Sequence, residues 1–203
     1  MEVIIIKSLG GEYLEKCKSS FKDTVDLPYK LQVMDELGSR EETLNKILKE
    51  NPKESLLIIT EDIVFVEGWY ESLEEHYNES DIFGWPMLYS DSKIIQDAGY
   101  DLSEIDSKIV LMPKYRGKKQ RAVEPRLCDY VCGCALFIKK HVLSRITQFP
   151  LEGKNKWGEF LFIQLAKQQS FKTMILDSFL SNQGKGTKTD LNKTANYDAE
   201  EKL

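Results

Sequence analysis

The first half of the chain alternates short apolar runs with segments of helical periodicity. The expected strands are residues 1–6, 31–35 and 56–60, and the expected helices are residues 12–21, 40–48 and 68–77. Ser39, with Glu42 three residues later, forms a capping box at the start of the second helix. Short apolar strands that alternate with helices are typical of a parallel sheet covered by helices on both faces. The chain is therefore expected to belong to the α/β class.

The second half of the chain is less regular. Its expected elements are a strand at 81–88 interrupted near Pro86, an edge strand at 92–100, a long strand at 130–139, helices at 140–146 and 157–168, and a final strand at 171–177. From Ser181 onwards the sequence is polar and almost without large apolar residues, which is typical of a surface tail. We predict one domain over residues 1–180. Residues 181–203 are predicted to be a polar tail, either partly disordered or the start of a linker in a longer multidomain chain.

The composition excludes several classes of protein. With 203 residues, 41% of them hydrophobic and 30% charged, the chain can bury a sizeable core and has the balance of a soluble globular domain. A formal net charge of -5 argues against a nucleic-acid partner, whose binding face would be basic. No apolar run approaches the roughly 18 residues of a transmembrane helix, and the first run lacks the length and basic flank of a signal peptide. A cytoplasmic protein is expected, near a membrane surface only through partners.

Acidic residues follow two neighbouring expected strands. Asp35 ends the second strand, and Glu61 and Asp62 come directly after the third. In an open parallel sheet, ligands bind outside the carboxyl ends of the strands, so these side chains should face one crevice. Carboxylates there could hold Mg2+ or Mn2+, which takes further oxygens from a nucleoside diphosphate. The alternative is that the acids are solvated loop residues or helix caps.

Three of the four cysteines lie close together, at Cys128, Cys132 and Cys134. A zinc site would need a fourth ligand, and neither Cys17 nor His141 has the spacing of a short zinc motif. The alternative is that the cysteines pack as small apolar side chains of a strand. A structural disulfide is not expected in a reducing compartment.

Residues 113–126 form a basic loop in an acidic protein. The basic side chains are Lys114, Arg116, Lys118, Lys119, Arg121 and Arg126. Two interpretations stay open. One is a mobile flap that meets an anionic donor or acceptor group, and the other is a solvated surface loop.

Six segments, in order along residues 2–180, are similar to segments of one known family. IIIKSLGGEYLEKCKSSF resembles its opening strand and helix, and LQVMDELGSREETLNKIL resembles its VVDNGSTDGTLELL. LLIITEDIVFVEGWYESL resembles LLLNPDVVVPPGWLEAL with its Asp-x-Asp motif, and FGWPMLYSDSKIIQDAGY resembles GPLLLYPDGRIQHAGG. YVCGCALFIKKHVLSRITQFP resembles VSGACMLIRREVFEEVGGFD, and KWGEFLFIQLAKQQSFKTMILDS resembles YGEDVDLCLRLRRAGYRVVYVPDA. The family is the inverting family 2 glycosyltransferases. The resemblance implies the GT-A fold, a single domain with a mixed, mostly parallel central sheet flanked by helices.

The resemblance implies how a donor is bound. Asp35 corresponds to the acid that contacts the nucleotide base or ribose, and Lys7-Ser8 stands where Thr-Tyr is common near the base pocket. Asp62 corresponds to the last acid of Asp-x-Asp, which binds the divalent metal. Glu61 corresponds to the middle position, which reaches the ribose or serves as a second metal ligand. The implied cofactors are Mn2+ or Mg2+, with a nucleotide-diphosphate sugar as cosubstrate.

The resemblance also implies an acceptor end. Gly133 and Cys134 correspond to the small pair beneath the donor sugar and acceptor, although tight strand packing would explain them equally well. Trp157 is the aromatic residue favoured to stack on the acceptor. Glu159 corresponds to the first acid of the family's Glu-Asp pair. It is the predicted catalytic base, because Phe160 stands where the usual base would be.

The sequence departs from the family pattern at other positions too. Thr60 stands where the first acid of Asp-x-Asp often lies, and Asn182 and Gln183 stand where a late metal-ligating His is expected. The expected function is a metal-dependent, inverting transfer of a hexosyl or deoxyhexosyl group to a glycan or glycolipid. The alternatives are a non-catalytic GT-A domain that binds a nucleotide or glycan, and an interaction domain of a larger glycan-synthesis protein.

Overall fold

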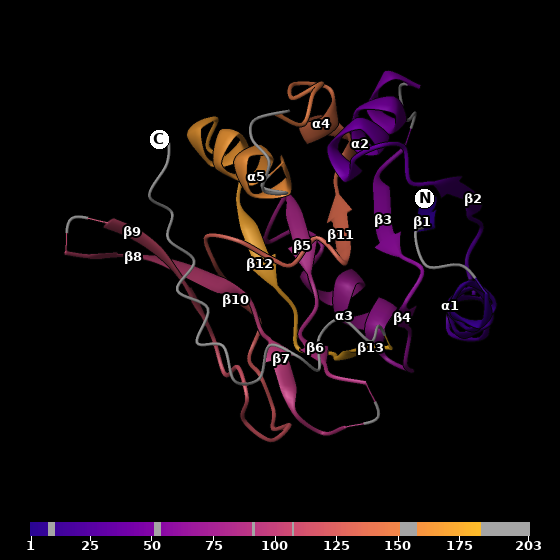
Figure 1. The fold of residues 1–203 in the computed structure, drawn as a ribbon, viewed down its shortest axis with the longest axis horizontal. Coiled ribbons are helices and arrows are strands. Elements are labelled where there is room, and N and C mark those ends of the chain that lie inside the picture. Colours follow the sequence, from indigo (N-terminus) through magenta and orange to yellow (C-terminus); the bar gives the residue numbers. More distant parts are fainter. Residues whose placement is uncertain (8–10, 51–53, 91, 107, 151–157, 184–203) are drawn as a thin grey trace.

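A mixed sheet runs through the middle of the protein in the computed structural model (Figure 1). The structure describes residues 1–7, 11–50, 54–90, 92–106, 108–150 and 158–183. Within them the strand order is β10 (Arg126–Leu127), β12 (Thr173–Ile175), β5 (Ile82–Gly84), β11 (Ala135–Ile138), β3 (Leu56–Thr60), β1 (Glu2–Lys7) and β2 (Lys30–Asp35). Strands β12, β5, β3, β1 and β2 run in one direction, and β11 and β10 run in the other. The predicted mixed, mostly parallel sheet is confirmed.

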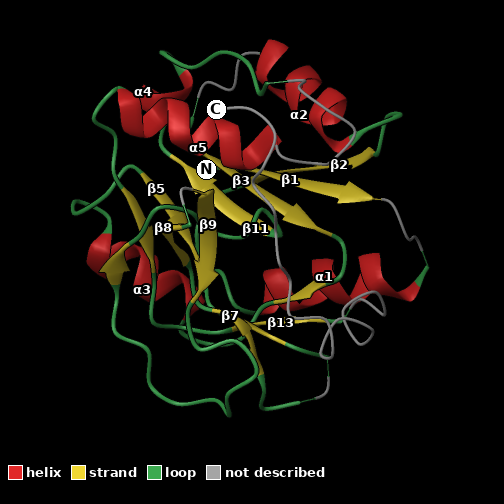
Figure 2. Cartoon of the chain, turned by 60° about the vertical axis from the view of Figure 1, so that its left-hand side comes forward, coloured by secondary structure: helices red, strands yellow, loops and turns green. Residues whose placement is uncertain are grey.

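Helices cover both faces of this sheet, as Figures 1 and 2 show from two directions. One face carries α2 (Arg40–Lys49), α4 (Lys140–Leu143) and α5 (Gly158–Gln168), and the other carries α1 (Glu12–Asp23) and α3 (Trp69–His76). Ile4 and Ile6 of β1 belong to the core that includes side chains of α2 and α5. Val3 and Ile5 belong to the core that includes Cys17 of α1. Val3 to Ile6 are apolar without interruption because both faces of β1 are buried.

A smaller sheet continues from the edge where the parallel strands end. Its order is β4 (Ile63–Val64), β13 (Leu180–Asn182), β6 (Met87–Leu88) and β7 (Ile95–Asp97). Strand β4 follows β3 along the chain, and β6 follows β5. Strands β8 (Tyr100–Ile105) and β9 (Lys108–Pro113) form a hairpin that projects from the body of the protein (Figure 1).

The strand predicted at 130–139 is shorter than expected, since only Ala135–Ile138 joins the sheet. The N–H of Tyr130 donates to the carbonyl of Tyr100 at 3.2 Å, and the N–H of Tyr100 donates back at 2.8 Å. The segment before β11 is therefore paired with the start of the hairpin and not with the central sheet. The hairpin itself was not predicted, because half of the residues of β8 are polar and they do not alternate regularly with apolar ones.

The predicted domain boundary at residue 180 falls inside β13. This strand extends to Asn182 and pairs with β4 and β6, so the folded part continues beyond the boundary. The rest of the predicted tail, residues 184–203, lies outside the described residues. None of the described helices has the length and apolar character that crossing a membrane requires.

Candidate active site

Lys7 and Asp35 lie side by side at the edge where β1 and β2 end. The two residues are partners in the strand register, and Lys7 Nζ is 3.3 Å from Asp35 Oδ1. The Asp35 side chain is 81% exposed, so it is accessible to a ligand. Both residues were predicted to contact the nucleotide. Ser8, predicted for the same contact, lies outside the described residues.

Glu61 and Asp62 follow β3 at the same edge of the sheet. The N–H of Glu61 donates to the carbonyl of Ile6 at 3.2 Å, which takes the chain across the end of β1. Glu61 is buried, and both acids lie near the buried thiol of Cys17 in α1. Burial, together with the charges of Asp62 and Glu61, raises the pKa of the Cys17 thiol to about 12. The two acids therefore lie on the α1 side of the sheet.

Asp62 carries a buried oxygen that suits a metal ion. Its Oδ1 is shielded from solvent and has no hydrogen-bond partner among the described residues. A buried carboxylate oxygen without a donor is unfavourable, and a divalent cation is a ligand that would satisfy it. In the part of the chain that the structure describes, no group of three or more His, Cys, Asp or Glu could hold a metal. The residues thus fit Mn2+ or Mg2+ only if water and phosphate oxygens complete its coordination.

Gln183 lies beside Asp62 and is one of the two residues at the place where the sequence resemblance led us to expect a metal-ligating His. Its N–H donates to the Asp62 carbonyl at 2.7 Å. Its side-chain Oε1 accepts from Lys16 Nζ at 2.8 Å. Gln183 therefore holds the Asp62 backbone in place, and its side-chain oxygen is directed to α1.

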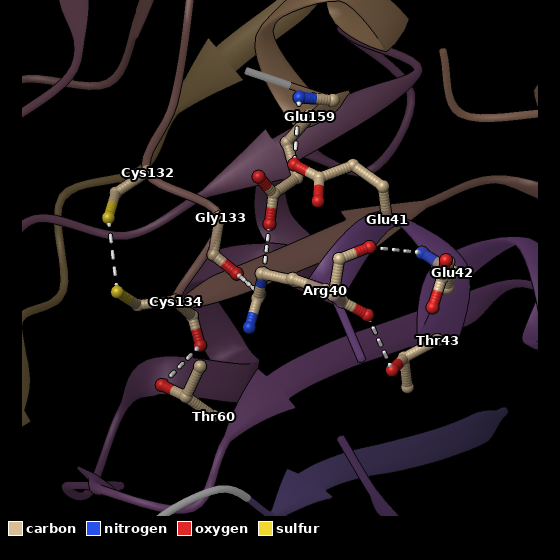
Figure 3. A network of polar contacts seen from close by, with 11 residues as sticks. Arg40, Glu41, Glu42, Thr43, Thr60, Cys132, Gly133, Cys134 and Glu159 are labelled. Atoms are coloured by element: carbon tan, nitrogen blue, oxygen red, sulfur yellow. Dashed lines mark hydrogen bonds and ion pairs between the residues drawn. The ribbon is translucent and has the colours of Figure 1, made fainter. Parts of the chain in front are cut away.

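Arg40 and Glu159 form a buried ion pair on the α2 and α5 side of the sheet (Figure 3). Arg40 Nε donates to Glu159 Oε1, and Arg40 Nη2 donates to the carbonyl of Gly133 at 2.5 Å. Burial lowers the pKa of the Arg40 guanidinium, but the charge of Glu159 more than offsets this and leaves the pKa above its ordinary value. The sequence reasoning missed Arg40. Its one signal was a cation in the first turn of a helix, where the helix dipole disfavours it.

The N-termini of α2 and α5 meet at this ion pair. Ser39 Oγ accepts from the N–H of Glu42 at 3.1 Å, which confirms the predicted cap of α2. The next residue but one, Glu41, accepts from the N–H of Gly158 through Oε1 at 3.3 Å (Figure 3). The cap thus sets the first turn of α2, and that turn brings Arg40 and Glu41 to the start of α5.

Gly133 lies between the Arg40–Glu159 ion pair and the residues that follow β3. A Cβ on Gly133 would lie 2.6 Å from Glu159 Oε1, so a side chain there would displace the carboxylate. The following residue, Cys134, accepts from the N–H of Thr60 through its carbonyl at 2.9 Å. Thr60 directly precedes Glu61. The structure therefore brings the predicted donor acids and the predicted Gly133-Cys134 floor to the same edge of the sheet.

Asp97, at the end of β7, is a second buried acid near Gly133 that the sequence reasoning did not single out. It is 1% exposed, and neither carboxylate oxygen has a hydrogen-bond partner among the described residues. Burial raises its pKa from 3.8 to about 7, although Gly99 N–H, Arg116 and the Cys132 thiol lie near enough to offset part of the effect. Its signal in the sequence was an acid within the apolar run IIQDAG.

At the start of α5 the structure describes Phe160 but not Trp157. The ring of Phe160 packs against Tyr130, with centroids 5.7 Å apart, so it serves as a packing residue. Trp157 lies outside the described residues. The four cysteines are free thiols, and Cys132 Sγ lies 3.3 Å from Cys134 Sγ (Figure 3).

The basic loop is held on the rest of the protein. Arg126 Nη1 and Lys114 Nζ pair with the carboxylate of Asp101 on β8, at 2.7 Å and 3.0 Å. The N–H of Gly117 donates to the carbonyl of Ile95 on β7 at 2.8 Å. These contacts favour an anchored surface loop over a mobile flap.

No protein-family model matches the sequence, and no curated protein sequence matches it. The solved structures that it resembles include A197 from STIV, with a TM-score of 0.51 and 16% identity over 87% of this chain and 82% of that one. They also include GalNAc-T7 in a crystal structure with UDP, GalNAc and Mn2+, with a TM-score of 0.59 and 13% identity. The chain has the GT-A fold. The second alignment covers 89% of this chain but only 43% of GalNAc-T7, so the chain spans less than half of that relative.

Proposed function

We propose that the chain is a metal-dependent, inverting glycosyltransferase, similar to family 2, that uses a nucleotide-diphosphate sugar. The observation that carries the proposal is the buried Oδ1 of Asp62, which lacks a hydrogen-bond partner in the described part of the chain, just after β3. The carboxyl edge of such a sheet is where α/β proteins bind their ligands. A neighbour with the same fold was crystallised with UDP, GalNAc and Mn2+.

At the donor end, the exposed carboxylate of Asp35 would contact the base or ribose, with Lys7 beside it and Ser8 next along the chain. Asp62 and Glu61 would hold Mn2+ or Mg2+. Glu61 would alternatively contact the ribose, as its counterpart in the resemblance to family 2 does. The metal would offset the negative charge that develops on the departing diphosphate.

At the acceptor end, Gly133 and Cys134 would form the floor beneath the transferred sugar, and Trp157 would stack on the acceptor. The acceptor hydroxyl of a glycan or glycolipid attacks the anomeric carbon opposite the diphosphate, which inverts its configuration. Glu159 is the sequence-based prediction for the group that removes the hydroxyl proton. Its contact with Arg40 offsets and orients its charge, because a guanidinium binds a carboxylate in a fixed plane.

A second candidate function is a GT-A domain that binds a nucleotide or glycan without turnover. The observation that favours it is Phe160, which packs on Tyr130 where the family's base would stand. For both candidates we propose a cytoplasmic location, near a membrane surface only through partners.

Isothermal calorimetry with UDP, GDP and dTDP, each with and without Mn2+, tests the donor site. We expect one nucleotide to bind in the presence of Mn2+, and transfer from the matching sugar nucleotide then separates the two candidates. Asp62→Ala should remove the Mn2+ dependence of binding, whereas the exposed Glu104→Ala in β8 is the control that should not. Absence of nucleotide binding in the unmodified protein would contradict the transferase and the nucleotide-binding form of the second candidate.

A further inference from the structure

Asp97 is a buried acid that nearby protein groups stabilise only in part: the N–H of Gly99, Arg116 and the Cys132 thiol favour its charged form, but burial outweighs them. The residue is 1% exposed, and in the described residues neither carboxylate oxygen accepts a hydrogen bond of normal geometry, although the N–H of Gly99 and the Cys132 thiol lie close to it. Native proteins pair nearly all of their buried polar groups, so an exception with both oxygens unsatisfied calls for a ligand or a chemical role. Asp97 sits at the end of β7, at the edge of the small sheet that continues from the carboxyl ends of β3 and β5.

The groups that face Asp97 come from three parts of the chain. Arg116 follows β9, Tyr100 begins β8, and Tyr130 and Cys132 belong to the segment before β11. Arg116 is the one cation among these groups, and burial raises the pKa of both phenols and adds to the raised pKa of the thiol. Apart from Arg116, the groups around Asp97 are thus neutral around pH 7. Burial is therefore the main influence on the pKa of the Asp97 carboxylate.

This cluster adjoins the proposed acceptor end. Cys132 directly precedes Gly133, and the Cys132 thiol points toward that of Cys134 on the other side of the glycine (Figure 3). Tyr130 lies close enough to Glu159, Cys132 and Asp97 for each charge to raise the pKa of its phenol. One carboxylate, bound to Arg40, therefore lies against Gly133, and a second, that of Asp97, lies near the preceding residue Cys132.

Resting on the proposed function, we propose that Asp97, and not Glu159, is the catalytic base that accepts the proton of the acceptor hydroxyl. Protonating Glu159 would break its charge-assisted contact with Arg40, whereas protonating Asp97 removes a buried charge that its protein neighbours offset only in part. A carboxylic acid whose pKa is raised to about 7 is also matched to proton transfer at neutral pH. Glu159 is then a positioning residue that holds Arg40 against Gly133.

The step balances without a further reactant. The acceptor oxygen forms a bond to the anomeric carbon while the bond from that carbon to the diphosphate oxygen breaks. The electron pair of the broken bond leaves with the nucleoside diphosphate, and the hydroxyl proton moves to an Asp97 carboxylate oxygen. With water as acceptor, the same step yields free sugar and nucleoside diphosphate.

Hydrolysis of the donor identified in the nucleotide panel tests this inference with the full chain and Mn2+, from pH 5.5 to 8.5. We expect kcat/KM to fall below about pH 7 in the unmodified protein, because the base must be ionised. Asp97→Asn should lower the rate by about 10²–10⁴-fold and remove this pH dependence. Its nucleotide affinity should stay within about twofold, and the exposed hairpin control Asp106→Asn should match the unmodified protein.

Azide as the nucleophile supplies the decisive comparison, since it is an anion and needs no base. In the unmodified protein, the rate of transfer to azide should not fall below about pH 7. In Asp97→Asn, the rate of transfer to azide should be retained. Wild-type hydrolysis by Asp97→Asn, equal loss of the azide and water reactions, or no turnover of a bound donor would each overturn the assignment. If Asp97→Asn does not fold, hydrolysis by Glu159→Gln decides the matter: its rate should still fall below about pH 7, and loss of that fall would assign the base to Glu159. Failure of the nucleotide to bind would instead refute the proposed function.

Discussion

The proposed donor end and the proposed acceptor end of the site hold their carboxylates in opposite ways. At the donor end, the Asp35 side chain is 81% exposed and its partner Lys7 is 39% exposed. At the acceptor end, Glu159 is 7% exposed and its partner Arg40 is 15% exposed. An exposed pair is screened by water and contributes little, whereas a buried charge depends on its partner. Burial, and not the presence of an ion pair, therefore decides which of these contacts supports the fold.

The largest difference between the two ends is expected when each cation is removed. Arg40→Met leaves the Glu159 carboxylate buried without its partner, which should lower the free energy of unfolding by about 3–5 kcal/mol. The matched change Lys7→Met should lower it by less than about 1 kcal/mol. Urea denaturation of both variants measures the comparison.

The double change of Arg40→Met and Glu159→Met sharpens this result. With both charges gone, most of the stability should return, because apolar side chains of similar volume can replace a buried ion pair. Equal effects of Arg40→Met and Lys7→Met would show that burial does not distinguish the two ends.

A second difference concerns pH. The pKa of Asp97 is about 7 in the folded protein, above its ordinary 3.8, so between these values the unfolded chain releases a proton that the folded chain retains. Stability from this group is therefore full below about pH 4 and is lost as the pH rises to about 7, by about 4 kcal/mol. Asp97→Asn removes that dependence. The free energy of unfolding of the unmodified protein minus that of Asp97→Asn, measured by urea denaturation, should decrease as the pH rises from 4 to 8. A difference that stays constant with pH would contradict the raised pKa.

A smaller effect is expected at Gly133. Gly133→Ala puts a methyl group where it meets Glu159 Oε1, so the carboxylate must move from Arg40 or the backbone must shift. We expect a loss of about 1–3 kcal/mol in thermal or urea unfolding. Adding Glu159→Ala should relieve the overlap, and a Gly133→Ala protein as stable as the unmodified one would show that the site tolerates side chains there.

The parts of the fold that follow from local pattern were predictable. The strands and helices of the first half and the Ser39 cap are carried by apolar periodicity and one hydrogen bond within the chain. Asp35, Glu61 and Asp62 were predictable as site candidates because strand ends in a parallel sheet share one edge. These features need no knowledge of distant contacts.

The acceptor end was harder to predict because its contacts link distant segments. Arg40 meets Glu159 across 119 positions and Gly133 across 93, and neither spacing leaves a trace in local sequence. Asp97 likewise depends on burial beneath Arg116 and two tyrosines, which only the folded chain brings together. Sequence similarity placed Glu159 near the acceptor, but its partner required the structure.

Calorimetric titration of nucleoside diphosphates with and without Mn2+, on the unmodified protein and on Asp62→Ala, tests the central claim most directly. Our account predicts binding that requires Mn2+ in the unmodified protein and that loses this requirement, together with most of its affinity, in Asp62→Ala. Nucleotide binding of equal strength in the two proteins, with no response to Mn2+, would contradict the account.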